Sequence, residues 1–190
     1  MPLDSNTLVK SGQISRLFGL VVNHDLPTAK HSLRVGKLAA RFAVKLGLSS
    51  SMIQLVSNAA LLHDVGKVMV PAQLLNKADP LTKEEFEIIK RHPENGYKLI
   101  YETFQPNVSK HLGEAILFHH EKYNGSGYPY GKAGDEIVLP ARIVAIADAY
   151  EAMISERVYH KAMPQEKAKN MIFEGKGSHF DPRLVELFFL

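Results

Sequence analysis

The chain has 190 residues, of which 45 % are hydrophobic, and a formal net charge of +3; this fits one domain with a sizeable core and does not favour a nucleic-acid polymer as partner. It contains no cysteine, which excludes disulfides and thiolate metal ligands. No apolar run approaches the length of about 18 residues that a membrane span needs, and Met1–Lys10 lacks the apolar core of a secretory signal, so we expect a cytoplasmic protein without a membrane segment.

Helical periodicity and capping signals define the predicted elements, and no segment alternates in the manner of a strand. In chain order, helices are predicted at 8–20, 28–46, from 50 or 51 to 62, 82–90, 95–102, 108–118, 141–153, 164–174 and from 182 onward. Loops are expected at 66–80, with a short turn, and at 121–139. The sequence predicts an all-α helical bundle, with residues 1–27 as a lead-in or linker and residues 28–190 as a single domain.

Local signals place several helix ends. Thr28 is a good N-cap, residues 82–85 (Thr-Lys-Glu-Glu) form a capping box, and Asp181 precedes a proline suited to the first helical position. A helix is usually interrupted before a proline, so His92, which precedes Pro93, is expected at a helix end.

The pair His63-Asp64 closes an otherwise apolar helix. Burying an ionised carboxylate is unfavourable unless a metal or hydrogen bonds compensate, and a pair of this kind, taken alone, is more often a hydrogen-bonded cap. Other polar residues at helix ends or faces favour a shared metal centre in a helical bundle; they are His31, His92, His119, His120 and Asp148.

The stretch from His119 to Pro129 combines two imidazoles, a cation and a glycine-rich turn. Consecutive helical residues point about 100° apart, so His119 and His120 can reach one site only where the helix ends. Glycines let the backbone approach a bulky anionic ligand. The stretch therefore indicates a junction between a metal site and a substrate cleft.

His63-Asp64 with distant His31 and Asp148 resembles the HD family of metal-dependent phosphohydrolases. Further motifs resemble its HD-GYP branch over about residues 28–188; they are His92-Pro93, His119-His120-Glu121, Gly127-Tyr128-Pro129 and 141–153. The resemblance implies an all-helical domain that hydrolyses the second messenger cyclic di-GMP to linear pGpG and often onward to GMP.

The resemblance also implies a ligand set. His31, His63, Asp64 and Asp148 would surround one metal, and Asp64 would bridge to a second metal held by His92, His119 and His120. Some members hold a third metal with a Glu four residues before the first His. Pro27 occupies that position here, so we expect two divalent ions, with iron or manganese favoured.

Two such cations about 3.5 to 4 Å apart can activate a shared water for attack on a phosphodiester. Asp64 and Lys67 are the predicted catalytic residues, with Lys67 stabilising charge on the phosphate oxygens; a solvated loop lysine is the alternative. The remaining predicted substrate contacts are Lys122, Gly127, Tyr128, Pro129 and Arg157. Arg157 lies in a segment where Val158 and His160 depart from the family pattern.

Two other functions stay open. The substrate could instead be cyclic GMP-AMP, or a nucleotide monoester, against which the Gly-Tyr-Pro loop argues. The chain could also be a signalling module that binds ligand or partners, such as diguanylate cyclases or sensory domains, through that loop with little turnover. About thirty residues precede His31, too few for a sensory domain, so we expect either a stand-alone protein or a catalytic fragment.

Overall fold

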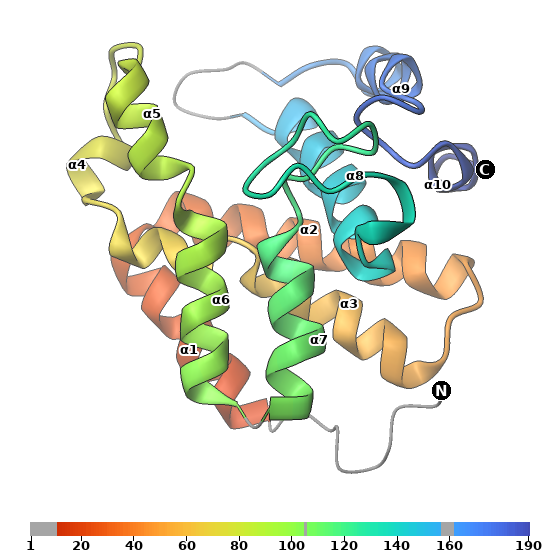
Figure 1. The fold of residues 1–190 in the computed structure, drawn as a ribbon. Helices are drawn as coiled ribbons and strands as arrows, with labels where there is room; N and C mark the ends of the chain where they lie inside the picture. Colours follow the sequence, from red (N-terminus) through yellow and green to blue (C-terminus); the bar gives the residue numbers. More distant parts are fainter. Residues whose placement is uncertain (1–10, 105, 157–161) are drawn as a thin grey trace.

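The computed structural model describes residues 11–104, 106–156 and 162–190, which form helices joined by loops, without a strand in these ranges (Figure 1). The α-helices are α1 (Ser11–His24), α2 (Leu26–Lys45), α3 (Ser50–Leu62), α4 (Ala72–Leu75), α5 (Lys83–Ile89), α6 (His92–Thr103), α7 (Pro106–Leu117), α8 (Leu139–Ile154), α9 (Gln165–Glu174) and α10 (Pro182–Phe188). Two 3-10 helices are η2 (Val65–Met69) and η3 (Gly134–Glu136). The all-α prediction is confirmed.

The centre of the bundle is made by α2, α3 and α8, with α6 and α7 packed beside them (Figure 1). Helix α2 contacts both α3 and α8, while α6 contacts α7 and η2. Their facing stripes consist of small and branched side chains that are fully buried, among them Val35, Ala39, Val56, Ala60, Ile116, Ile143 and Ala147. Burying one such branched side chain contributes about 2 kcal/mol, and small residues let the helices that carry the polar residues approach closely.

Helix α1 shares this core. Its buried residues Ile14, Leu17 and Val21 recur at helical spacing and belong to the same hydrophobic cluster as the central helices. The helix contacts α2, α3 and η2. The predicted lead-in helix therefore packs against two elements, α2 and η2, that carry predicted site residues.

The start of α2 differs from the prediction. The N-cap is Asp25, not Thr28: the side chain of Asp25 accepts a hydrogen bond from the backbone N–H of Thr28, at 2.9 Å. Pro27 stands in the first turn, where its missing N–H leaves no helical hydrogen bond unmade. Helix α2 consequently begins at Leu26, and His31 lies in its second turn.

The segment between α3 and α6 is more ordered than expected. The predicted loop at 66–80 contains most of η2 and all of α4, because short helices close their own backbone hydrogen bonds without needing a long apolar stripe. The capping box predicted at Thr82 and Glu85 is present, with both reciprocal hydrogen bonds formed. His92 does lie at a helix end, as its first residue: α6 begins there and takes Pro93 into its first turn, so the predicted start at Asn95 was late.

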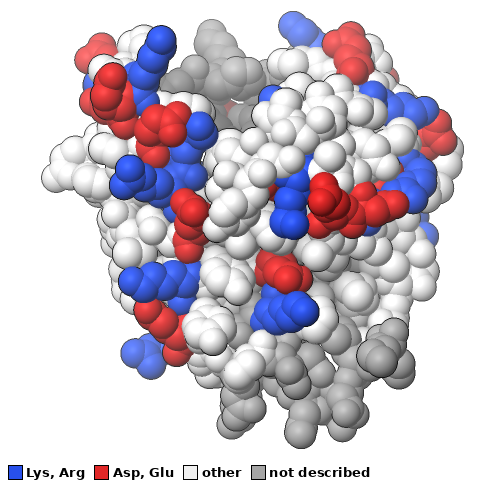
Figure 2. All heavy atoms as spheres, viewed as in Figure 1, with Lys and Arg blue, Asp and Glu red and all other residues white. Residues whose placement is uncertain are grey.

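No helix in the described ranges combines the length and the apolar character needed to cross a bilayer. On the face shown in Figure 2, the charged side chains of both signs are interspersed. This pattern agrees with the small net charge of the chain.

Candidate functional site

Two groups of potential metal-binding side chains meet where α2, α3, α6, α7 and α8 come together. One group consists of His31, His63 and Asp64, and the other of His92, His119 and His120; within each group the ligand atoms lie within 4.8 Å of one another. All are buried except His120, which is half-buried. The structure thus brings together residues up to 89 positions apart in the sequence, with Asp148 of α8 beside them.

Asp64 stands between the two groups. Its Oδ2 lies 3.3 Å from Nε2 of His63, and its Oδ1 lies 3.3 Å from Nε2 of His92. Burial acts to raise the pKa of Asp64, but the charges of His63 and Lys67 outweigh it and hold the pKa well below its usual range. An ionised carboxylate with one oxygen toward each group is the arrangement that a bridging ligand requires.

Asp148 completes the first group from the side of α8. Its Oδ1 lies 2.8 Å from Nε2 of His31 and 3.7 Å from Nε2 of His63. Burial opposes ionisation of Asp148, yet hydrogen bonding to His31 and the charge of His63 lower its pKa below the ordinary value. Two imidazole nitrogens and two carboxylates therefore face one small volume.

The orientation of three imidazoles follows from their own helical turns. Nδ1 of His63 lies 2.7 Å from the carbonyl oxygen of Ala60, and Nδ1 of His92 lies 2.8 Å from that of Ile89. Nδ1 of His119 lies 2.5 Å from the carbonyl oxygen of Ile116. A carbonyl oxygen only accepts, so each Nδ1 carries a hydrogen, and a ring in its neutral form presents the lone pair of Nε2 to the site.

With the hydrogen on Nδ1, the imidazoles of the second group can bind a cation through Nε2. The Nε2 atoms of His92 and His119 lie 3.3 Å apart, and in neutral rings neither carries a hydrogen to place between them. Burial is the largest cause that lowers the pKa of His92 to about 3 and that of His119 to about 4. Two buried lone pairs that face each other are unfavourable without a shared cation, so the donor set fits a divalent first-row metal.

The first group also favours a positive charge between its side chains. Burial acts to lower the pKa of His63, but the carboxylates of Asp64 and Asp148 outweigh it and raise the pKa to about 9. A positive charge is therefore favoured between these side chains. Either a proton on Nε2 of His63 or a metal ion between the side chains supplies this charge.

Three residues that the sequence did not single out for the site lie behind His31. Glu151, which is 1 % exposed, contacts Nδ1 of His31 through Oε2 and the guanidinium Nε of Arg34 through Oε1. Ser155 donates its hydroxyl hydrogen to the same Oε1. The spacing of Asp148 and Glu151, one helical turn apart on α8, is the sequence signal that could have indicated this.

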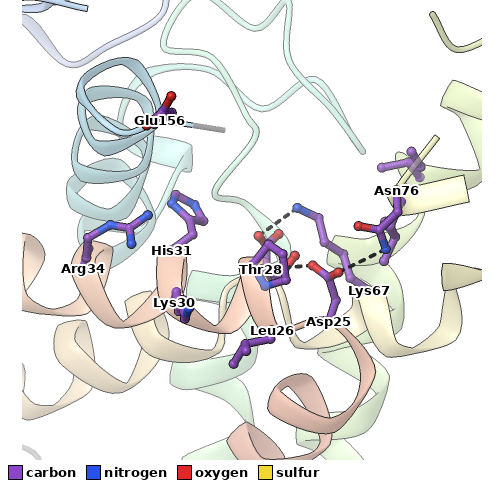
Figure 3. Close-up of a pocket in the computed structure, with 13 residues that line it drawn as sticks. Asp25, Leu26, Thr28, Lys30, His31, Arg34, Lys67, Asn76 and Glu156 are labelled. Atoms are coloured by element: carbon purple, nitrogen blue, oxygen red, sulfur yellow. Dashed lines mark hydrogen bonds and ion pairs between the residues drawn. The ribbon is translucent and has the colours of Figure 1, made fainter. Parts of the chain in front are cut away.

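A cavity of about 770 Å³ opens beside the first group (Figure 3). Its lining includes His31, apolar side chains from neighbouring elements and charged side chains of both signs; the cations are Lys30, Arg34 and Lys67, and the carboxylates are Asp25, Asp64 and Glu156. Lys67 donates a hydrogen bond to Oδ2 of Asp64 at 2.8 Å. In Figure 3, His31 and Arg34 rise from α2, while Asp25 is held between Thr28 and Asn76. A cavity of this size admits a small organic ligand, and its cations suit an anionic one.

The glycine-rich loop touches the second group rather than this cavity. The ring of Tyr128 stacks on His120, with centroids 4.8 Å apart. A Cβ on Gly127 would stand 2.3 Å from the backbone nitrogen of Lys122, so only glycine fits there. Glu121 fixes the loop by accepting from the backbone N–H of Tyr130 at 2.7 Å.

The predicted substrate contacts are therefore not all in one place. Lys67 lines the cavity, whereas Lys122, Gly127, Tyr128 and Pro129 are absent from its lining. Arg157 and the neighbouring Val158 and His160 lie outside the described residues. His24 belongs to neither group: its ring contacts the carbonyl oxygen of Val70 at 2.9 Å.

Comparison with known proteins agrees with this geometry. The family model described as "HD domain" matches residues 17–184. A protein of Vibrio cholerae named "Probable cyclic di-GMP phosphodiesterase" is 37 % identical over 99 % of this chain and 47 % of its own length. A second Vibrio cholerae protein, named "3'3'-cGAMP-specific phosphodiesterase 2", is 37 % identical over 84 % of this chain and 30 % of its own length.

A solved structure shares the fold. The HD-GYP-type protein Bd1817 of Bdellovibrio bacteriovorus superposes with a TM-score of 0.67 at 24 % identity, covering 84 % of this chain and 50 % of that one. The chain spans about half or less of the length of these relatives. It belongs to the HD domain family, in the branch of HD-GYP proteins.

Proposed function

We propose that this chain is the catalytic domain of a metal-dependent phosphodiesterase that hydrolyses cyclic di-GMP to linear pGpG. The observation that carries the proposal is the position of Asp64 between two groups of inward-facing donors, 3.3 Å from Nε2 of His63 and of His92. The name of the Vibrio cholerae relative supports the substrate. Two metal ions, with iron and manganese first, would be held by His31, His63, Asp64, Asp148, His92, His119 and His120.

Bound ions of this kind lower the pKa of a water and polarise a phosphate oxygen. The side chains of Asp64 and Lys67 would position the two groups and the phosphate. Asp64 keeps the two groups in register because each of its oxygens faces one of them. Lys67, whose ammonium already lies 2.8 Å from Oδ2 of Asp64, is placed to meet the phosphate and to stabilise the charge that grows on its oxygens. Hydrolysis adds the water oxygen to phosphorus, breaks the bond from phosphorus to the 3′ oxygen, and leaves a proton on that oxygen.

Cyclic GMP-AMP is the second candidate substrate, because relatives of similar identity are named as phosphodiesterases specific for it. Both dinucleotides carry two phosphates, so the cations Lys30, Arg34 and Lys67 of the cavity suit either one. The two substrates differ in one base. Measured kcat/KM values for the two dinucleotides therefore decide between them.

The test is turnover of both dinucleotides by the purified chain, loaded with Fe²⁺ or Mn²⁺ and with its metal content quantified. An Asp64→Ala variant should lose turnover, whereas Asp79→Ala, which changes an exposed loop carboxylate, should retain it. Metal binding without cleavage of either dinucleotide, across the first-row metals, would refute the enzymatic function. A higher kcat/KM for cyclic GMP-AMP would make cyclic GMP-AMP the substrate and leave the proposed hydrolysis of a phosphodiester unchanged.

A further inference from the structure

His31 is oriented differently from the other imidazoles of the site. His63, His92 and His119 each have Nδ1 against a backbone carbonyl oxygen three residues earlier. Nδ1 of His31 contacts the carboxylate of Glu151 instead, across the interface between α2 and α8. A carboxylate is a stronger acceptor than a carbonyl oxygen because it carries a full negative charge.

Glu151 is enclosed by donors. It is 1 % exposed, and its two oxygens have different partners. Oε2 contacts His31, while Oε1 contacts Nε of Arg34 and the hydroxyl of Ser155. A buried carboxylate stays ionised only where opposite charges and hydrogen-bond donors surround it, as they do here. Its donors fix its position, and its position in turn fixes the ring of His31.

The two helices present these groups in register. Arg34 follows His31 by three residues on α2, and Glu151 follows Asp148 by three residues on α8, so each pair lies on one helix face. His31 therefore touches Asp148 through Nε2, at 2.8 Å, and Glu151 through Nδ1. One ring is held from both sides by consecutive turns of the same helix.

We propose that Glu151 is a positioning residue for the metal centre: it holds the hydrogen of His31 on Nδ1, orients the ring so that Nε2 faces the first group, and increases the donor strength of that nitrogen. Arg34 acts through Glu151 by holding its carboxylate in place. Carboxylates behind metal-binding histidines have this effect in general. The inference rests on the proposed function, because it takes the first group to bind a metal.

The test is the affinity of the full chain for Mn²⁺, measured by competition with a chromophoric chelator, with bound metal counted separately. Glu151→Gln keeps the size of the side chain, but its amide N–H₂ must face at least one of the donors now bound. We expect one of two ions to bind 10- to 100-fold more weakly. Glu151→Asp, which keeps the charge on a shorter side chain, should recover part of that loss and guards against a variant that fails to fold.

The matched control is Asp181→Asn. Asp181 is also a buried carboxylate, 2 % exposed and paired with Arg142 and Arg183, but it lies outside both groups. Its variant should melt at a lower temperature and bind Mn²⁺ as the unchanged chain does. Equal losses of affinity in Asp181→Asn and Glu151→Gln would reduce the effect to general destabilisation and overturn the inference.

A double variant tests the role of Arg34. If Arg34 acts through Glu151, then Arg34→Gln should weaken Mn²⁺ binding less than Glu151→Gln does, and the two changes together should be no worse than Glu151→Gln alone. Additive losses would overturn this part. An unchanged chain that binds no metal refutes the proposed function, whereas two bound ions with equal affinity in Glu151→Gln refute only the positioning role.

Discussion

The Nε2 atoms of His92 and His119 lie 3.3 Å apart, and the hydrogen of each neutral ring is on the other nitrogen. This relationship joins the start of α6 to the end of α7. It places two lone pairs together in a buried site, so the second group is stabilised by whatever cation lies between them. Metal binding and folding should therefore be coupled.

The first prediction concerns metal removal. Adding Mn²⁺ to metal-free protein should raise the midpoint of thermal unfolding, and at a free concentration of about a thousand times Kd the gain is about 4 kcal/mol. A chelator should reverse the shift. The control is His24→Gln, which changes a histidine outside both groups and should keep the full shift. A midpoint that does not respond to Mn²⁺ in the unchanged chain contradicts the prediction.

The second prediction concerns Gly66, where η2 meets α6. A Cβ at this position would lie 2.0 Å from the carbonyl oxygen of His92 and 2.5 Å from the backbone nitrogen of Gly96. These are backbone atoms that cannot rotate away, so Gly66→Ala should destabilise the fold by about 3 kcal/mol. Denaturant unfolding measures the loss.

The matched control for Gly66→Ala is Gly19→Ala in α1. A Cβ on Gly19 meets nothing within 4 Å, and alanine favours a helix over glycine by about 1 kcal/mol. That variant should be as stable as the unchanged chain or more so. Similar losses in both variants would show that the close approach of η2 to α6 is not the cause.

The third prediction concerns Lys67. Its ammonium contacts Asp64 and lines the cavity, so Lys67→Gln should lower kcat by about 10² to 10³ while both metal ions remain bound. Steady-state kinetics measure the loss of kcat, and metal counting shows whether both ions remain bound. Lys37→Gln, on the exposed face of α2, should leave kcat unchanged. Loss of bound metal in Lys67→Gln would instead make Lys67 a structural partner of Asp64.

The fourth prediction concerns pH. Burial acts to raise the pKa of Asp181, but hydrogen bonds from Arg183 and the charge of Arg142 outweigh it and lower the pKa below the unfolded value. Because the folded form releases the proton more readily, this carboxylate stabilises the fold at pH values above the unfolded pKa of about 4. That contribution is lost as the pH falls through the lowered folded pKa.

Urea unfolding from pH 7 down to pH 3 measures this contribution. The stability difference between the unchanged chain and Asp181→Asn should be largest near neutral pH and should shrink as the solution becomes acidic. Glu174→Gln, which changes an exposed carboxylate at the end of α9, should follow the unchanged chain throughout. A difference that stays constant with pH would mean that Asp181 acts through its shape and not its charge.

The sequence predicted those helix ends that depend on interactions within a single turn. The capping box of Thr82 and Glu85 formed as expected because both partners lie within one turn. The start of α2 was misplaced because Thr28 and Asp25 are both good caps, and the sequence alone does not show which side chain reaches the backbone N–H. The pairing of Glu151 with Arg34 could not be predicted, because 117 positions separate the two residues in the sequence and only the packing of α2 on α8 joins them.

Three of the four imidazoles oriented through Nδ1 take their acceptor from the main chain, which every amino acid supplies. Substitutions at Ala60, Ile89 or Ile116 leave those carbonyl oxygens in place. At His31 the acceptor is a side chain, so its strength can be altered by a single codon change. Natural variation that tunes the first group should therefore accumulate at position 151 and at the residues that hold it, while the second group keeps a constant orientation.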